Sequence, residues 1–499
     1  MRSSLFSACG ALLFSAGAIA SDAPWTNYTY KTGPWQPPQL LIDRTDAVDP
    51  GLIFIPVRNS NTDGTAVTIY NNDGQLIYQG PEEITMDFKV QSLYGKNVIT
   101  FWSGTPQISG GFGYGTVHIL DDTYNEIYTV TLQEDFQTAD GKSWDSYIDV
   151  HEHIITDRNT LIVSAINVTQ YDLSSAGGPS DGWITVSQFY EIDIPTNKVV
   201  YKWDVLDHQE AIPLSGSKYP PPSNNARETP WDCYHLNSVE ATNDGFLVSL
   251  RFYWSAFYLN QDGTVRWQFS GAGDDEGDFT GDDNLFSWQH HFRIYNETDE
   301  SLVLSVFNNA NGQQQSQSIT TGMAFDVDLT SMSATLMHNL TDPNDPLKTQ
   351  TQGSFQFLGA ASTASNVFIG YGSIPKVKEY DGAGNVVLSG QFDPLGHGES
   401  YRAFKSEWTA TPLWSPVAVA EKSDSGVDVY MSWNGATEYD NWAIYSVPTA
   451  SSNSTTFLTT MKRTSFESHA TLSDVKTGYI KVAARKGNSV LRFSDVVSV

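Results

Sequence analysis

A strand–turn–strand unit recurs along this chain, and its spacing constrains the fold more than any other feature. In each unit an apolar run meets a turn of Asp, Asn or Gly and a second run leaves, as in "AVTIYNNDGQLIYQG" and "AFYLNQDGTVRWQFSG". The units begin near residues 66, 117, 189, 256, 324 and 377, and "AIYSVPTASSNSTTFLTTM" near residue 443 could be a seventh. No long stretch shows a helical period. Repeats of about four strands every 50 to 70 residues predict an all-β protein, a β-propeller of six or seven four-stranded blades.

The N-terminal segment reads as a targeting signal rather than as part of the fold. Residues 1–20, "MRSSLFSACGALLFSAGAIA", combine a charged start, an apolar run and a small-residue cleavage site, which predicts a secretory signal peptide. No low-complexity linker follows, so residues 21–499 are expected to form a single propeller domain. Removal of the signal would leave Cys233 as the one cysteine, and therefore no intrachain disulfide.

Charge and sequons indicate where such a protein works. The formal net charge of −29 repels nucleic acid and anionic membranes, and no later run reaches the roughly 20 apolar residues of a membrane helix. We therefore expect a secreted, extracellular monomer with no nucleic-acid or membrane partner. Five sequons predict a glycoprotein of eukaryotic type: Asn27, Asn167, Asn296, Asn339 and Asn453.

Three histidines occupy the same place in the repeat. His151, His235 and His290 stand ten to twelve residues before the apolar runs "LIVS", "FLVS" and "LVLS". Equivalent positions in successive blades face one axis, so residues far apart in sequence are expected to converge on one pocket. Because neighbouring side chains on a strand point to opposite faces, only one member of the pair His290 and His291 can face that pocket.

Several chemistries fit this pattern. The histidines could be structural groups bonded to neighbouring blades. His151 and His153 share one strand face, as zinc ligands would, but no cysteine joins them, and we expect neither a metal nor another cofactor. Alternatively, neutral imidazole is a nucleophile and base with an unperturbed pKa of ~6.5. Arg251, downstream of His235, could then neutralise the oxygens of a sulfuryl group or a carboxylate.

The segments that carry the histidines resemble a known family. "IDVHEHIITDRNTLIVS", "WDCYHLNSVEATNDGFLVSLR", "GTVRWQFSG" and "FSWQHHFRI" with "LVLSVFNNANG" occur in the order of the arylsulfotransferase family, in its secreted fungal branch. The resemblance runs from about residue 149 to residue 445. It implies a β-propeller that moves a sulfuryl group from an aryl sulfate to a phenol through a sulfohistidine, without a nucleotide sulfate donor.

The family motifs also imply a role for each matching residue. By that resemblance His290 is the nucleophile, His235 the general acid or sulfate binder, and Arg251 the sulfate clamp. His151 is implied as the remaining catalytic histidine. Asn237 and Gln289 belong to the same motifs and are expected to bind substrate. Asn309 and Tyr234 are also predicted to bind substrate.

Two positions depart from the family pattern. Phe252 follows Arg251, where the family usually has a histidine, and Asn308-Asn309 stands where the family usually has Asp-Asn. Losing that acid could leave a histidine unoriented.

Two other functions therefore stay open for a small aromatic or sugar substrate. One is a carbohydrate-active lyase in which His235 or His290 is the base, Arg251 holds a uronate and Tyr234 is the acid. The other is a non-catalytic propeller whose aromatic side chains bind sugars or phenols.

Overall fold

The computed structural model describes residues 26–59, 65–107, 111–273, 276–281, 285–312, 318–473, 475 and 477–499. The predicted signal peptide, residues 1–20, lies outside them. The described chain is built from strands and four short 3-10 turns and contains no α-helix, which confirms the all-β class. Within these residues no helix is long and apolar enough to span a membrane.

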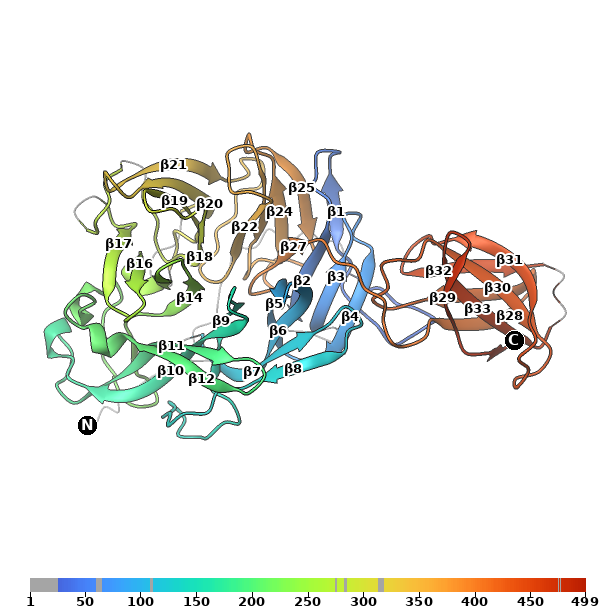
Figure 1. Ribbon diagram of the computed structural model, residues 1–499, viewed down its shortest axis with the longest axis horizontal. Coiled ribbons are helices and arrows are strands. Elements are labelled where there is room, and N and C mark those ends of the chain that lie inside the picture. The colour runs from blue at the N-terminus through green and yellow to red at the C-terminus, as the bar shows by residue number, and fades with distance from the viewer. Residues whose placement is uncertain are drawn as a thin grey trace, which may run out of the picture.

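Groups of antiparallel strands surround a common centre in a propeller-like arrangement (Figure 1). The first two groups are β2 (Leu52–Asn59), β3 (Ala66–Tyr70) and β4 (Leu76–Glu82), then β5 (Thr85–Leu93), β6 (Lys96–Pro106), β7 (Gly113–Leu120) and β8 (Glu126–Val130). Next come β9 (Ile148–Ile155), β10 (Thr160–Tyr171), β11 (Gly182–Asp193) and β12 (Lys198–Asp204), with β13 (Trp231–Asp232) beside β11. The remaining groups are β14 (Leu236–Ala241), β15 (Gly245–Leu250), β16 (Ser255–Asn260) and β17 (Val265–Ser270); β18 (His290–Tyr295), β19 (Ser301–Asn308), β20 (Thr321–Asp328) and β21 (Ser333–Leu340); and β22 (Ser354–Leu358), β23 (Asn366–Gly370), β24 (Lys376–Tyr380) and β25 (Val386–Gln391).

The first and last groups each take a strand from the other end of this region. β1 (Leu41–Arg44) pairs with β25, so an early segment adds the edge strand of the last group. Conversely, β26 (Gly398–Glu399) and β27 (Phe404–Ser406) both pair with β2 in the first group. These exchanges join the two ends of the arrangement by backbone hydrogen bonds and cover strand edges that would otherwise be exposed.

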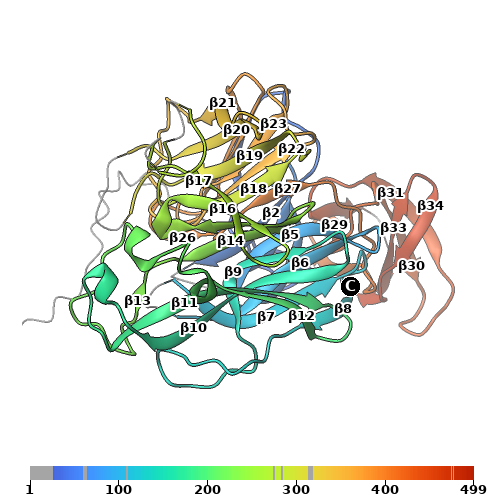
Figure 2. The ribbon, with the colours of Figure 1, turned by 60° about the vertical axis from the view of Figure 1, so that its left-hand side comes forward.

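Aromatic and branched side chains fill the space between neighbouring groups. One buried cluster joins the third group to the fourth and contains Trp203, Phe246 and Phe257. The next cluster joins the fourth group to the fifth and contains Trp267 and Leu304. Figure 2 shows these sheets stacked beside one another. The aligned apolar runs of the sequence supply this packing between sheets.

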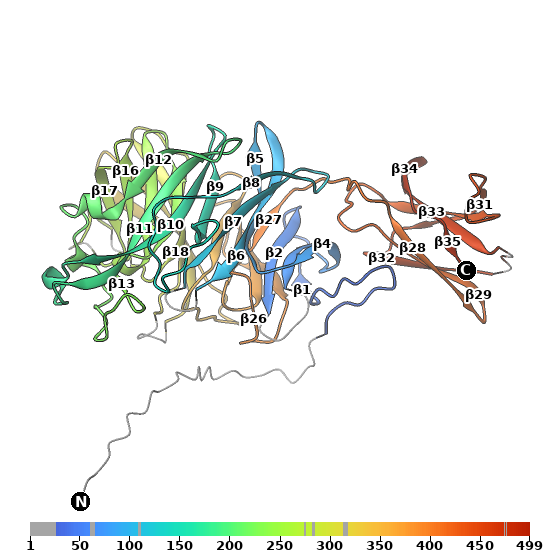
Figure 3. The same cartoon turned by 90° about the horizontal axis from the view of Figure 1, so that it is seen from below.

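The C-terminal strands form sheets of their own. β28 (Val417–Ser423), β29 (Gly426–Ser432) and β32 (Glu467–Leu472) make one, and β30 (Asn441–Val447), β31 (Thr456–Lys462), β33 (Tyr479–Lys486), β34 (Ser489–Phe493) and β35 (Val497–Ser498) make the other. They share a core that includes Trp433 and Trp442 and lie to one side of the other groups (Figure 3).

This second unit differs from the expected single propeller over residues 21–499. The run near residue 443, considered as a seventh repeat, supplies β30 and β31 of the second unit. β29 pairs with β32, which lies beyond the whole β30–β31 hairpin. Such non-local pairing cannot be read from the spacing of the repeat.

Charged side chains are buried where the inner strands meet. Glu152 on β9 lies 2.7 Å from Arg293 on β18, 3.2 Å from Arg402 before β27 and 3.4 Å from Lys89 on β5. Asp87 lies 2.7 Å from Lys89 and 3.3 Å from Arg402. All five side chains are buried. We call them the central charge cluster; it connects strands from three of the groups with the segment before β27.

The electrostatic balance of this cluster favours ionised Glu152. Burial by itself would raise the pKa of Glu152. The positive charges of Arg293, Arg402 and Lys89 lower it by more than burial raises it, so the pKa lies well below its ordinary value of 4.5. Since the pKa of the folded state is depressed, the stabilisation from this charge is present above about pH 4.5. It is lost as the pH falls through the folded-state pKa.

Glu152→Gln should therefore destabilise the protein strongly. The substitution keeps the side-chain size but leaves two buried guanidinium groups short of a counter-charge, for which we expect a loss of about 3–5 kcal/mol. Urea denaturation followed by tryptophan fluorescence at pH 7 measures it. Asp73→Asn, which removes an exposed pair with Arg44, is the control and should cost less than about 1 kcal/mol. Equal losses in the two variants would contradict the role assigned to the cluster.

Candidate functional site

Three of the sequence-predicted histidines meet in one cavity. The cavity has a volume of about 670 Å³, and His151, His235 and His290 line it together with Arg251. The ring centroids of His151 and His235 are 4.8 Å apart, and those of His235 and His290 are 6.5 Å apart. Residues from three strand groups therefore lie within reach of one small substrate.

Carboxylates orient two of these rings. His151 Nδ1 lies 2.6 Å from Asp149 Oδ2, and His235 Nδ1 lies 2.5 Å from Asp232 Oδ2. Because an ionised carboxylate only accepts hydrogen bonds, Nδ1 of His151 is the donor to Asp149, and Nδ1 of His235 donates to Asp232 whenever Asp232 is ionised. The other nitrogen of each ring, Nε2, is left for a substrate.

An amide orients the third ring. His290 Nδ1 lies 2.7 Å from Asn309 Oδ1. The Asn309 amide donates from Nδ2 to Thr349 Oγ1 and to the carbonyl of Gln352, each at 3.0 Å, which fixes its oxygen toward His290. His290 thus carries its proton on Nδ1 and a lone pair on Nε2. The backbone N–H of Gln352 donates to that lone pair at 3.2 Å, so anything bound to Nε2 must lie next to this donor.

Arg251 is a buried cation at the wall of the cavity. It opens the short 3-10 turn η4 (Arg251–Tyr253), which ends β15, and its backbone N–H donates to the carbonyl of His235. Its Nη2 donates to the carbonyl of Gln350 at 2.8 Å, and its Nε has no hydrogen-bond partner. Across the described part of the chain no carboxylate lies within ion-pair distance of Arg251. Such a cation at a cavity wall is suited to an anionic ligand.

Burial decides the charge states in the cavity. It lowers the pKa of Arg251 to about 10, still well above neutrality. It also lowers the pKa of His290 well below its ordinary value, with a further contribution from the charge of Arg251. The pKa of Asp232 is raised to about 7, again by burial. At neutral pH His290 is therefore uncharged, as a nucleophile requires, while the Asp232–His235 pair exchanges a proton in this range.

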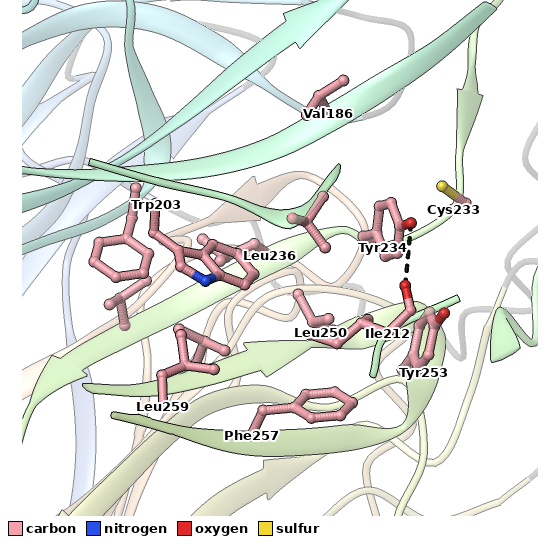
Figure 4. Packing of buried hydrophobic residues seen from close by; sticks show 14 of the residues in the cluster. Val186, Trp203, Ile212, Cys233, Tyr234, Leu236, Leu250, Tyr253, Phe257 and Leu259 are labelled. Carbon is pink, nitrogen blue, oxygen red and sulfur yellow. Dashed lines mark hydrogen bonds between the residues drawn. The ribbon is translucent and has the colours of Figure 1, made fainter. Parts of the chain in front are cut away.

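Four other predicted site residues do not line the cavity. One of them, Asn309, contacts His290 from behind the cavity wall. Tyr234 lies in the hydrophobic core, where its hydroxyl donates to the carbonyl of Ile212 (Figure 4). Asn237 is fully buried and donates from Nδ2 to the carbonyl of Gln289 at 2.7 Å. Gln289 in turn donates to Ser249 Oγ at 3.2 Å. These two amides connect β14, β15 and the start of β18.

The neighbours of the pocket histidines also lie elsewhere. His291 has a left-handed backbone, with φ of +53°, at the bulge where β18 shifts register against β19. Its Nδ1 accepts a hydrogen bond from the backbone N–H of Phe355. His153 contacts Asp87 in the central charge cluster and Thr100. Throughout the described ranges, no set of three or more His, Cys, Asp and Glu side chains is arranged to hold a metal ion.

The two departures from the family pattern have structural counterparts. The ring of Phe252 lies 4.9 Å from that of His235 and lines the cavity. Asn309, rather than an acid, orients His290. Asn308 accepts hydrogen bonds from the backbone N–H groups of Ser287 and Ala310.

Several side chains that complete the site were not among the predicted residues. Asp149 and Asp232 precede their histidines by two and three residues, and that proximity was the available signal. No sequence pattern marked the aromatic wall and the neighbouring amide, which are Phe112, Trp288, Tyr401 and Gln352.

Comparison with known families now decides the relationship. The family model described as arylsulfotransferase (ASST) matches residues 89–393, more than half of the chain. The chain belongs to the arylsulfotransferase family. The match includes all four cavity residues that the motifs had suggested, and it supports an arylsulfotransferase-like transferase.

Other comparisons add less to this assignment. No curated protein sequence matches the chain. A protein from Lactobacillus plantarum is similar in structure at 12% identity and a TM-score of 0.34, over 72% of this chain and 100% of its own. An α-L-arabinanase from Penicillium chrysogenum, complexed with arabinobiose, is similar at 11% identity and a TM-score of 0.31, over 71% of this chain and 92% of its own. A mutant of the GH43 protein BlXynB from Bacillus licheniformis is similar at 9% identity and a TM-score of 0.31, over 83% of this chain and 88% of its own. Similarities at this level carry no argument about the function of an arylsulfotransferase-family chain.

Removing the unpaired cation should weaken anion binding in this family member. Arg251→Gln deletes a charge-assisted contact worth about 1.5–3 kcal/mol, so a non-reactive aryl sulfonate should bind about 10 to 100 times more weakly. Isothermal titration calorimetry measures this change. Arg158→Gln, which removes a half-exposed cation paired with Glu191, is the control and should leave the affinity unchanged. Unchanged affinity in Arg251→Gln would contradict the anion site.

Proposed function

We propose that this protein transfers a sulfuryl group from an aryl sulfate to a phenolic acceptor through a sulfohistidine at His290. The observation that carries the proposal is the presence in one cavity of a neutral, oriented His290 and of Arg251, a cation that forms no ion pair among the described residues. A nucleophile and an oxyanion clamp are the two groups that such a transfer requires.

In the proposed first step, the hydrogen bond from the Gln352 N–H to His290 Nε2 breaks, and the freed lone pair forms a bond to the sulfur of the aryl sulfate. The sulfur–oxygen bond to the aryl group breaks, and its electron pair leaves with the phenolate oxygen. The phenolate takes a proton from Nε2 of His235, which the Asp232–His235 pair supplies. Arg251 and the backbone N–H of Gln352 hold the sulfuryl oxygens.

In the proposed second step, an acceptor phenol replaces the product. Its oxygen forms a bond to sulfur while its proton passes to His235 Nε2, and the sulfur–nitrogen bond breaks. The electron pair of that bond returns to His290. Both the catalytic residues and the proton count are restored, so one sulfuryl group has moved between two phenols without a cofactor.

The cavity walls support an aromatic substrate. The ring centroids of Phe112 and His235 are 5.0 Å apart. The rings of Phe252 and Trp288 pack edge to face with centroids 5.6 Å apart. Aromatic rings prefer such neighbours at these separations. The lyase alternative loses its proposed acid, because Tyr234 is in the core. The binding-only alternative predicts no turnover.

The number of blades, the location, the oligomeric state and the glycosylation of the protein are also proposals. We propose six blades, with β1 and β27 joining the two ends, in a secreted, extracellular, monomeric glycoprotein of the fungal branch. Three of the five sequon asparagines are exposed, which supports glycosylation there: Asn296, Asn339 and Asn453.

His290→Ala should abolish transfer, because among the described cavity residues only His290 has an unprotonated Nε2 with its ring held by the Asn309 amide. The assay follows phenol release from para-nitrophenyl sulfate with and without a phenolic acceptor. Mass spectrometry of the enzyme incubated with donor alone should show one added sulfuryl group, absent in the variant. His469→Asn, on an exposed strand of the C-terminal unit, should react normally. Transfer that persists in His290→Ala would refute the proposed nucleophile.

The rate of the first step should fall as the pH rises through about 7. Burial places the pKa of Asp232 near that value, and above it the Asp232–His235 pair has lost the proton needed by the leaving phenolate. The fall should be steeper for phenyl sulfate than for para-nitrophenyl sulfate, because the para-nitrophenolate leaves more readily without protonation. Stopped-flow measurement of both donors between pH 5 and 9 tests this. Parallel profiles, or a profile unaltered in Asp232→Asn, would contradict it.

A further inference from the structure

A second cavity lies between the first strand groups and the C-terminal unit. Its volume is about 730 Å³. Its walls include the end of β4, His118 on β7, Trp414 before β28 and Asn434 after β29. It shares no lining residue with the histidine cavity.

Direct contacts between the two units build the walls of this cavity. Asn434 accepts from the backbone N–H of Gln79 at 3.0 Å and donates to its carbonyl at 2.9 Å. Trp414 donates from Nε1 to the carbonyl of Asn434 at 2.9 Å. The site therefore depends on both units.

Aromatic surfaces form much of the wall. Tyr78 and Tyr124 are stacked with ring centroids 4.2 Å apart, and Trp414 lies 5.7 Å from Tyr124. Trp414 is 39% exposed and Trp35, also on the wall, is half-buried, so both retain free ring surface. Ring faces of this kind attract cations and the apolar faces of other rings.

The charge of the wall is negative. Glu82, Glu83 and Glu126 line it, and no Lys or Arg stands among the described lining residues. Its one histidine, His118, is already bonded at both nitrogens, to Glu126 at 2.6 Å and to Ser103 at 2.8 Å. The wall therefore repels anions, in contrast to the cavity that holds Arg251.

A buried hydrogen-bond acceptor is left over at the same place. Gln79 lines the cavity with only 3% of its surface exposed, and its Oε1 has no hydrogen-bond partner. An unsatisfied buried acceptor costs about 1–3 kcal/mol, which a ligand donor could recover. Together with the carboxylates, this amide makes the wall rich in acceptors, so the matching ligand must supply N–H or O–H donors.

We propose that this junction cavity binds an organic cation that combines an ammonium group with an apolar ring face. The ammonium group contacts the carboxylates and the ring lies against Trp414 or Trp35. An amino sugar and an aromatic amine both have this chemistry. The proposal is independent of sulfuryl transfer, since the two cavities are lined by different residues.

Calorimetric titration of the full chain with three probes tests the proposal. A glucosamine trimer and tyramine carry the required ammonium and ring, and an N-acetylglucosamine trimer is the neutral control. We expect binding of at least one cationic probe that weakens with added salt, and at least tenfold weaker binding of the neutral trimer. The cationic probe that binds more tightly identifies the source of the ligand.

Matched variants separate the cavity from general attraction to an acidic protein. Trp414→Ala and Glu83→Gln should each weaken binding of the cationic probe about fivefold or more. Phe457→Ala and Glu300→Gln remove an exposed ring and an exposed carboxylate elsewhere and should have no effect. Absence of binding, equal binding of the neutral trimer, or equal effects of cavity and control variants would each overturn the proposal. Sulfuryl transfer by Trp414→Ala and Glu83→Gln should be unchanged.

Discussion

The ion pairs around Glu152 are the interaction on which the rest of the structure depends. Buried charges are tolerated only when they are paired, and here the partners of Glu152 come from β18, β5 and the segment before β27. Pairing at these positions fixes how the inner strands align. His151 and Tyr401 line the cavity, while the adjacent Glu152 and Arg402 reach the cluster.

The same alignment assigns different chemistry to similar residues. His235 and His290 have comparable burial, but a carboxylate contacts one ring and an amide contacts the other. The carboxylate allows the pair to hold and release a proton near neutrality, whereas the amide leaves His290 neutral with a defined lone pair. Arg251 adds a cation that forms no ion pair within the described structure. Differences in partners, rather than in residue type, separate acid, nucleophile and clamp.

Much of this site could be predicted from sequence. The shared offset of His151, His235 and His290 from the apolar runs identified the converging residues, because repeat register is a linear property of the chain. Side-chain direction outside regular strands was not predictable. His235 has a φ of +55°, and Tyr234 before it turns into the core. Asn237 and Gln289 belong to the matched motifs, yet they bond to backbone and side-chain groups of neighbouring strands.

By itself, the sequence determined the all-β class, the repeat, the family and the four residues that meet in the cavity, because these follow from local patterns and their spacing. Tertiary structure decided what those patterns leave open. The strands after residue 417 form a separate unit because β29 pairs with β32 across an intervening hairpin. Asn309, the partner that sets the proton position on His290, and the junction cavity beside Trp414 likewise arise from contacts between segments that are separated in sequence. Such contacts depend on packing in three dimensions, and no periodic pattern in a single sequence predicts them.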